Sequence, residues 1–222
     1  MDTAVVWFRD DLRVSDNPTL ADAVSGAESV VPVYVSDPRR RGESTYGPAK
    51  LGAHRARFRR ESILDLRDSL RQRGGELLVR TGFVEDVIPR IAAETGSDAV
   101  FCQTKPATEE LERERAVSQA LPDDTTFERR FTHTLYHIND LPTPYDSIDD
   151  TFTPWRKEVE AGTSVREPVP APERLSVPDG LDAGTVPSLA DLGLDDPPSD
   201  DRAVLRFEGG ETAGKARVEE YL

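Results

Sequence analysis

Along the first 131 residues, hydrophobic side chains gather into short runs that alternate with longer stretches of helical periodicity. The runs are rich in strand-favouring residues and lie at 3–9, 30–35, 76–80, 98–102 and 125–131. Strands that alternate with helices in this way are typical of a parallel sheet. We therefore predict an α/β fold, a five-stranded, parallel, doubly wound (Rossmann-like) sheet flanked by helices.

Four helices are expected between these strands. The clearest one covers about 50–73, where one face is charged and the other carries Leu51, Phe58, Ile63, Leu66 and Leu70. The glycine pair at 74–75 should end it. Another helix begins at Pro18 with Asn17 as its cap, and two more are expected over 83–95 and 108–121.

The loop after the first strand is densely charged. A dinucleotide-binding fold has glycines there, so that its backbone can approach a pyrophosphate. This chain instead has Arg9, Asp10, Asp11, Arg13, Asp16 and Asn17. The absence of a glycine cradle argues against a dehydrogenase. The charged side chains are interpreted either as an ion-pair network that fixes the loop or as an interface toward another domain.

Beyond residue 131 the alternating pattern ends. A short helix is expected over 152–161 with Thr153 as its cap, and residues 162–201 hold seven of the seventeen prolines, which is linker composition. We predict an α/β domain over 1–135 and an extended, Pro-rich interdomain linker over 136–206.

A last, short carboxy-terminal helix is expected over 207–222. The stretch from residue 204 to the end of the chain contains apolar residues that need a surface to pack on: Val204, Leu205, Phe207, Val218, Tyr221 and Leu222. Two alternatives are open. Either this run folds back onto the sheet, or it opens a further domain.

The chain of 222 residues carries a formal net charge of −14, with only four lysines among 28 cationic residues. So acidic a surface argues against autonomous binding to nucleic acid, which needs a basic footprint. An acidic surface that prefers Arg to Lys is similar to that of halophile proteins, because molar salt screens like-charge repulsion. The alternative is an ordinary acidic cytosolic protein.

Cysteine and histidine are scarce. Cys102 is the only cysteine, so an internal disulfide framework is excluded. No motif places a histidine or another base near Cys102, so we do not expect it to be a catalytic nucleophile. The three histidines (His54, His133 and His137) are too scattered for a metal site, and none is expected. No apolar run reaches the roughly 18 residues of a membrane span, and the first strand leaves no room for a signal peptide. We therefore expect a cytoplasmic protein without a membrane partner.

Several segments together resemble the photolyase/cryptochrome family. The opening Val-Trp-Phe-Arg-Asp-Asp-Leu-Arg-Val-Ser-Asp-Asn-Pro-Thr-Leu is similar to the amino terminus of that family. Thr132-His-Thr-Leu-Tyr-His-Ile-Asn-Asp-Leu-Pro and Phe152-Thr-Pro-Trp-Arg-Lys-Glu-Val-Glu resemble segments of its DASH-type cryptochromes. Phe207-Glu-Gly-Gly-Glu-Thr-Ala resembles the entry into the family's helical flavin-binding domain, and the match runs in order through the whole chain.

The resemblance implies a function. The chain is expected to be the amino-terminal antenna domain of a blue-light-dependent, FAD-containing deoxyribodipyrimidine photolyase, with residues 207–222 opening the helical domain. FAD, and DNA that carries pyrimidine dimers, would bind the absent helical domain, which is the expected partner. This domain would hold an antenna pigment, methenyltetrahydrofolate or a deazaflavin. Alone, the chain is expected to have no repair activity, although the full-length parent would be a lyase.

The resemblance also directs attention to the carboxyl ends of the strands, where ligands of open α/β sheets bind. The family's folate-contacting Glu corresponds to Glu110, and a carboxylate accepts hydrogen bonds from pterin N–H groups. Gln103, Cys102 and Asp37 follow or end neighbouring strands and are further candidates. The simpler interpretation is that Glu110 only interacts favourably with the helix dipole, as acids in a first helical turn do, and that Gln103, Cys102 and Asp37 only end strands.

Two other functions remain open. The first is a cryptochrome that signals and does not repair DNA. The second is a stand-alone nucleotide-binding module of the stress-protein or electron-transfer-flavoprotein type.

Overall fold

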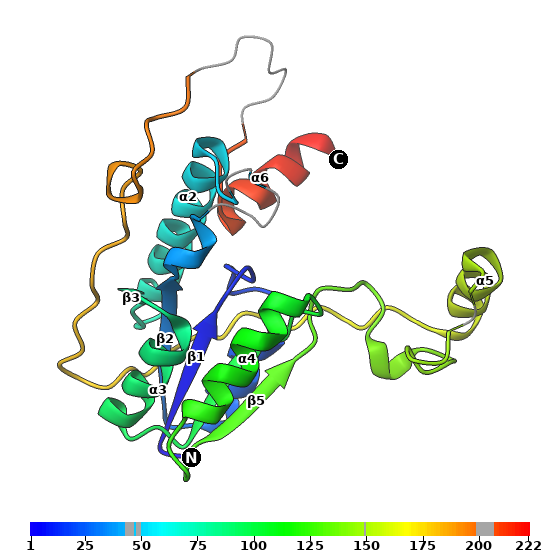
Figure 1. Ribbon diagram of the computed structural model, residues 1–222. Coiled ribbons are helices and arrows are strands. Elements are labelled where there is room, and N and C mark those ends of the chain that lie inside the picture. Colours follow the sequence, from blue (N-terminus) through cyan, green and yellow to red (C-terminus); the bar gives the residue numbers. More distant parts are fainter. Residues whose placement is uncertain (43–46, 48–49, 149, 199–206) are drawn as a thin grey trace.

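The computed structural model describes residues 1–42, 47, 50–148, 150–198 and 207–222. Its centre is one sheet of five parallel strands in the order β3-β2-β1-β4-β5 (Figure 1). The strands are β1 (Thr3–Phe8), β2 (Ser29–Ser36), β3 (Leu78–Thr81), β4 (Ala99–Gln103) and β5 (Thr126–Arg130). The predicted doubly wound α/β fold is confirmed.

Helices cover both faces of the sheet. Helices α1 (Pro18–Gly26) and α2 (Ala53–Arg71) pack on the face that Val6 and Phe8 present. Helices α3 (Val84–Thr95) and α4 (Thr108–Ala120) pack on the face of Val5 and Trp7. The central strands β1, β2 and β4 are therefore buried on both faces, which explains why their sequences are continuous apolar runs. Among the described residues, no helix has the length and apolarity to cross a bilayer.

Most of the predicted helix ends hold. The Asn17 side chain accepts a hydrogen bond from the Leu20 amide, and Gly74 adopts φ +82° just beyond α2. Two details differ. Phe58 is 48% exposed because it faces away from the sheet, which Ile63, Leu66 and Leu70 contact. Leu51 precedes α2 rather than lying in it.

The Pro-rich residues 167–194 run along the domain and are called the strap below. The backbone N–H of Val30 donates to Ser176 O, and that of Val79 donates to Ala183 O, both at 2.8 Å. Leu175 enters the hydrophobic core. A Cβ at Gly184 would lie 2.3 Å from Val79 O, so only glycine fits there. The boundaries predicted for the linker remain a prediction, but the strap is anchored on the domain through these backbone bonds and through the buried side chains of Leu175, Val186 and Leu189.

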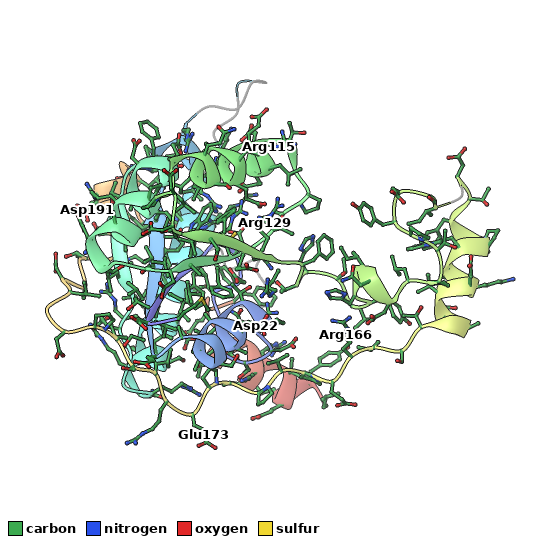
Figure 2. All side chains as sticks on the ribbon, turned by 90° about the horizontal axis from the view of Figure 1, so that it is seen from below. Asp22, Arg115, Arg129, Arg166, Glu173 and Asp191 are labelled. Carbon is green, nitrogen blue, oxygen red and sulfur yellow. The ribbon has the colours of Figure 1, made fainter. Side chains whose placement is uncertain are left out.

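Residues 131–148 and 150–166 form an arm that extends away from the sheet (Figures 1 and 2). It contains a short 3₁₀ helix, η2 (Ile138–Asp140), and helix α5 (Phe152–Gly162). The Arg166 guanidinium closes the base of the arm on the Asp140 carboxylate, with Nε–Oδ2 at 2.6 Å. The expectation that Thr153 caps α5 is wrong: Thr151 holds the cap position, without a side-chain bond, and Thr153 lies within the helix.

Helix α6 (Glu211–Tyr221) lies against α2 (Figure 1). The Glu211 carboxylate accepts from the Val14 and Ser15 amides, while Gly209 N–H donates to Glu61 at 2.8 Å. The run thus folds back, but onto α2 and the first loop rather than onto the sheet. Its apolar residues stay exposed: Phe207, Val218, Tyr221 and Leu222. Val204 and Leu205 lie outside the described residues.

Candidate functional site

The first loop begins with an arginine that occupies the crevice between two strands. The Arg9 side chain is fully buried, and its Nη1 donates to Gln103 O at the end of β4, at 2.9 Å. The same guanidinium pairs with the Glu110 and Glu114 carboxylates of α4. In open α/β sheets the crevice between diverging crossovers, here β1 and β4, normally receives the ligand. In this protein a side chain fills it, as the glycine-free loop suggested.

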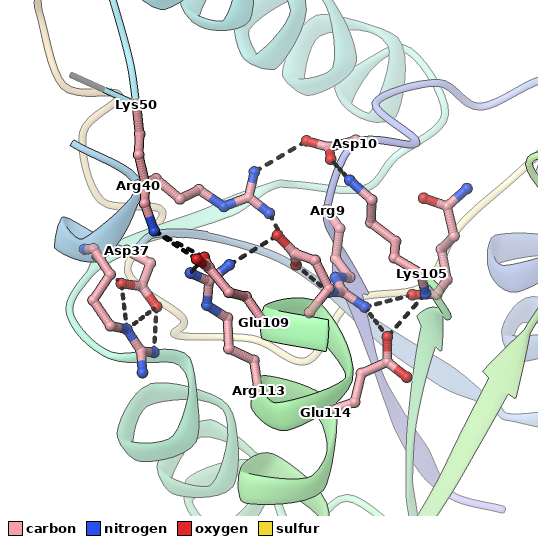
Figure 3. Close-up of polar contacts among 12 residues, drawn as sticks. Arg9, Asp10, Asp37, Arg40, Lys50, Lys105, Glu109, Arg113 and Glu114 are labelled. Atoms are coloured by element: carbon pink, nitrogen blue, oxygen red, sulfur yellow. Dashed lines mark hydrogen bonds and ion pairs between the residues drawn. The ribbon is translucent and has the colours of Figure 1, made fainter. Parts of the chain in front are cut away.

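Next to Arg9, Asp10 forms ion pairs with three cations, and Figure 3 shows two of them, Arg40 and Lys105. Asp10 pairs with Arg40 at 3.0 Å, with Arg59 of α2 at 3.1 Å, and with Lys105. Burial alone would raise the pKa of Asp10, but Arg40 and Lys105 outweigh burial and hold that pKa well below its usual value. Asp10 therefore stays ionised and ties the first loop to α2 and to the loop after β4.

The predicted ion-pair network of the first loop is thus present, but its partners lie mainly on other elements. Arg13 and Asp16 form the one pair within the described loop, at 3.9 Å. Arg13 also donates to the Asp16 backbone carbonyl at 2.8 Å.

A cavity of about 260 Å³ opens beside this network. It lies at the carboxyl end of β2, between α2 and the first turn of α4, one strand away from the filled crevice. Tyr34 and Ser36 form its floor, and Leu51 and Ile63 contribute apolar wall. The strap closes the far side with Val186, Pro187 and Leu192. A wall that is apolar on one side and charged on the other suits an amphiphilic ring system.

The remaining walls are strongly cationic. Eight Arg and Lys side chains line the cavity, against four acidic ones. Three of the cations come from α2, namely Arg55, Arg59 and Arg60; the others are Arg40, Arg41, Lys50, Lys105 and Arg113. The acids are Asp10, Asp37, Glu109 and Glu110. This excess of positive charge contrasts with a chain whose net charge is −14.

Glu110, the first sequence candidate, lines the cavity. Its carboxylate accepts from Arg113 at 2.8 Å and from Arg9, and lies 3.7 Å from Arg40. Burial raises the pKa of Glu110, but the charges of Arg40 and Arg9 prevail and keep the pKa below its ordinary value. Each oxygen of a carboxylate has two acceptor sites. Glu110 thus keeps capacity for a donor from a ligand.

The other three candidates are placed differently. Asp37 lines the cavity, but its buried carboxylate is held by Arg39, which also pairs with Glu85 at 2.6 Å. Gln103 donates to the Thr132 hydroxyl at 2.7 Å and lies outside the cavity lining. Cys102 faces the core beneath α3 and α4, where burial raises the pKa of its thiol. The structure therefore brings together Glu110 and Asp37, but not Gln103 or Cys102.

Sequence reasoning missed most of the cationic wall. The charged face of α2 was noted, and the spacing of Arg55 and Arg59, four residues apart, was a usable signal because such residues share a helix face. The contribution of Val186 and Leu192 had no such signal, because their segment has linker composition.

Comparison with known proteins identifies this architecture. A DNA photolyase family model matches residues 4–173. The chain belongs to this family. It is 62% identical to the cryptochrome DASH of Natronomonas pharaonis, a haloarchaeon, over 100% of this chain and 47% of that protein. It is 45% identical to the cryptochrome DASH of Gloeobacter violaceus, over 99% of this chain and 44% of that protein.

A solved structure supports the same assignment. The Synechocystis sp. PCC6803 cryptochrome superimposes with a TM-score of 0.93 at 35% identity, and the match covers 100% of this chain and 46% of that one. The chain thus spans about half the length, or less, of the relatives it matches. It corresponds to the amino-terminal domain of a DASH-type cryptochrome.

Proposed function

We propose that this domain is the light-harvesting half of a blue-light-dependent, FAD-containing deoxyribodipyrimidine photolyase that repairs cyclobutane pyrimidine dimers. The observation that carries the proposal is the cavity at the carboxyl end of β2, in a photolyase-type sheet whose usual phosphate crevice is filled by Arg9. The flavin, the lesion pocket and the DNA surface are assigned to the part of the relatives that this chain does not span.

The cavity fits an antenna pigment in two respects. Its apolar wall of Leu51, Ile63 and Val186 offers a surface for a ring, and Glu110 offers an acceptor for ring N–H groups. When bound, such a pigment would absorb near-ultraviolet or blue light and pass the excitation to the flavin. The protein's own task is to orient the ring, to keep water from it and to hold the Glu110 carboxylate ionised.

Glu110 has a defined role in this proposal. Arg9 and Arg113 fix the direction of its carboxylate, so that its free acceptor sites are aimed before the ligand arrives. Gln103 contributes through Arg9, because its backbone carbonyl accepts from the guanidinium. Asp37 positions Arg39 at the entrance of η1 (Pro38–Arg40). Cys102 supports the sheet beneath α4 and would not contact the pigment.

The experiment uses the full-length protein purified with its pigments. Glu110→Gln should lower the near-ultraviolet or blue absorbance of the bound antenna pigment relative to protein, whereas Glu112→Gln, an exposed position two residues on, should leave it unchanged. Equal pigment retention in both variants would reject the role of Glu110. Loss of FAD together with the pigment would indicate a folding defect instead.

A photoreceptor without repair activity is the second candidate, because the DASH relatives carry the name cryptochrome. Illumination of the full-length protein with a dimer-bearing single-stranded oligonucleotide separates the two. Light-dependent recovery of intact pyrimidines supports the photolyase. No recovery from a protein that is fully loaded with reduced flavin would favour the photoreceptor.

A further inference from the structure

The last part of the strap differs from the rest in how it is attached to the domain. We propose that residues 187–194, called the lid below, open and close over the cavity at the carboxyl end of β2 while the preceding part of the strap stays in place. The role of the lid rests on the proposed function, because the lid would control how the antenna pigment enters and leaves. Its movement concerns this chain alone and is tested without a pigment.

The part of the strap just before the lid is held by hydrogen bonds. The Arg67 guanidinium of α2 donates to the carbonyl oxygens of Ala183 and Gly184, at 2.8 and 3.1 Å. The Arg80 guanidinium of β3 donates to the carbonyl oxygen of Asp182 at 2.7 Å. Arg67 is only 7% exposed, so release of its acceptors would leave a buried charged donor without a partner, which is costly. This anchor therefore stays closed.

The lid, in contrast, satisfies its hydrogen bonds internally. It contains the short 3₁₀ helix η3 (Ala190–Leu192). The Ser188 amide and hydroxyl both donate to the Asp191 carboxylate, at 2.8 and 2.7 Å. The Leu194 amide donates to Leu189 O at 2.9 Å. Among the described residues, no hydrogen bond joins the lid to another segment, so the lid can leave the domain as one unit without losing any of these bonds.

Apolar contacts hold the lid closed. Leu189 is 8% exposed and packs on Leu51 and Ala56 at the beginning of α2. Leu192 and Leu194 pack against the same cluster, which is separate from the two core clusters on the faces of the sheet. Opening therefore exposes a few apolar side chains and leaves the main core intact. Its free-energy cost is a small part of the cost of unfolding the domain.

Opening of the lid would uncover the cavity. Pro187 and Leu192 form part of the cavity wall, and Leu51 and Ala56, which lie beneath the lid, also line it. The lid is the orange turn beside α2 in Figure 1. Val186 belongs to the core cluster on the sheet, so we place the pivot at the bond between Val186 and Pro187. A ring would then enter without any movement of α2 or α4.

Thiol labelling tests the opening without a ligand. The variants are made in the full-length protein, treated with N-ethylmaleimide and read by peptide mass spectrometry, with the buried Cys102 as internal reference. Ala56→Cys places a thiol beneath the lid, and Ala92→Cys, at a similarly buried position of α3, is the control. We expect Ala56→Cys to react at least about a hundredfold faster, because its thiol is exposed by lid opening and not only by unfolding.

Two results would overturn the lid. The first is equal labelling of Ala56→Cys and Ala92→Cys. The second is fast labelling of Ala56→Cys together with equally fast hydrogen exchange of its amide, which donates to Gly52 O at 3.0 Å. The first turn of α2 would then fray, and the lid would not be the moving part. If Ala56→Cys fails to fold, as judged by circular dichroism, Leu51→Cys gives the same readout from the same cluster.

The control of pigment exchange is tested separately. Leu189→Ala removes the central contact of the lid, and Leu181→Ala, in the strap before the anchor, is the matched control. In full-length protein with bound pigment, Leu189→Ala should speed the loss of near-ultraviolet or blue antenna absorbance during dialysis at least about tenfold, and Leu181→Ala should leave it unchanged. Equal loss from both variants would overturn the gating role. A protein that holds no pigment but labels as expected would count against the proposed function and support the lid.

Discussion

The buried ion pair between Arg9 and Glu114 allows the sharpest prediction. Their side chains are 0% and 1% exposed, and Glu114 also accepts from the Thr104 hydroxyl at 2.7 Å and from the Lys105 amide at 3.0 Å. The substitution Glu114→Gln removes the negative charge and keeps the shape. It leaves the buried guanidinium of Arg9 with Glu110 as its remaining carboxylate.

The magnitude follows from this geometry. Removal of one partner from a buried ion pair typically costs about 3–5 kcal/mol. Because Glu110 still compensates Arg9 in part, we take the lower end, about 3 kcal/mol. For a chain of this size each kcal/mol lowers the melting temperature by about 2–4 °C, so Glu114→Gln should melt about 6–12 °C lower.

The assay is thermal unfolding followed by circular dichroism, with Glu112→Gln as the control on the same helix. Glu112 is exposed, and such surface changes stay within about 0.5 kcal/mol. A melting temperature of Glu114→Gln within about 2 °C of the unaltered chain would refute the reasoning. It would show that the stability of the domain does not depend on the ion pair between Arg9 and Glu114 in the crevice between β1 and β4.

Three further predictions follow. Gly209→Ala should speed amide hydrogen exchange in α6 about tenfold, because the new Cβ would lie 1.9 Å from Phe58 O. Gly214→Ala is the control, because a Cβ there meets nothing within 4 Å, and equal exchange rates in the two variants would contradict the prediction. The pKa of Asp10 is lowered in the folded state, so its carboxylate stabilises the fold above the unfolded pKa of about 4 and this stabilisation is lost as the pH falls. Asp10→Asn should therefore flatten the decline in melting temperature between about pH 5 and pH 2, and an unchanged slope would contradict the prediction. The melting temperature should rise toward about 2 M KCl, because salt screens the net charge of −14, and a flat response would speak against a halophile surface.

The sheet and its helices could be predicted because local signals coincided with the global fold. Apolar runs such as 30–35 and 98–102 are buried on both faces, and the Asn17–Pro18 pair marks a helix start by a backbone mechanism. Most strand and helix limits therefore agree within about two residues, although α2 begins three residues and α6 four residues later than expected. The resemblance to the photolyase family, carried by whole segments, was confirmed.

The site was predicted only in part. Glu110 and Asp37 line the cavity because they follow strand ends, and strand ends converge at one edge of a parallel sheet; their roles as pigment contacts stay predictions. Cys102 fell on the other face, because side chains alternate along a strand. The packing of the strap was not predicted. Its prolines indicate that the segment cannot form a regular helix or central strand, but they do not show whether it packs against the rest of the domain.

The position of helix α2 has a consequence for the proposed transfer of excitation to the flavin. Arg55 and Arg59 line the cavity at the carboxyl end of β2 and also border a second hollow that Gly210 and Glu211 of the α6 segment help to form. Under the proposed function, a single helix, roughly 10 Å across, would therefore separate the ring of the pigment from what packs beyond α6. Dipole–dipole transfer falls steeply with separation and depends on relative orientation. A spacer of one helix diameter would set both, and the segment before α6 lies so close to α2 that a Cβ at Gly209 would come within 1.9 Å of Phe58 O.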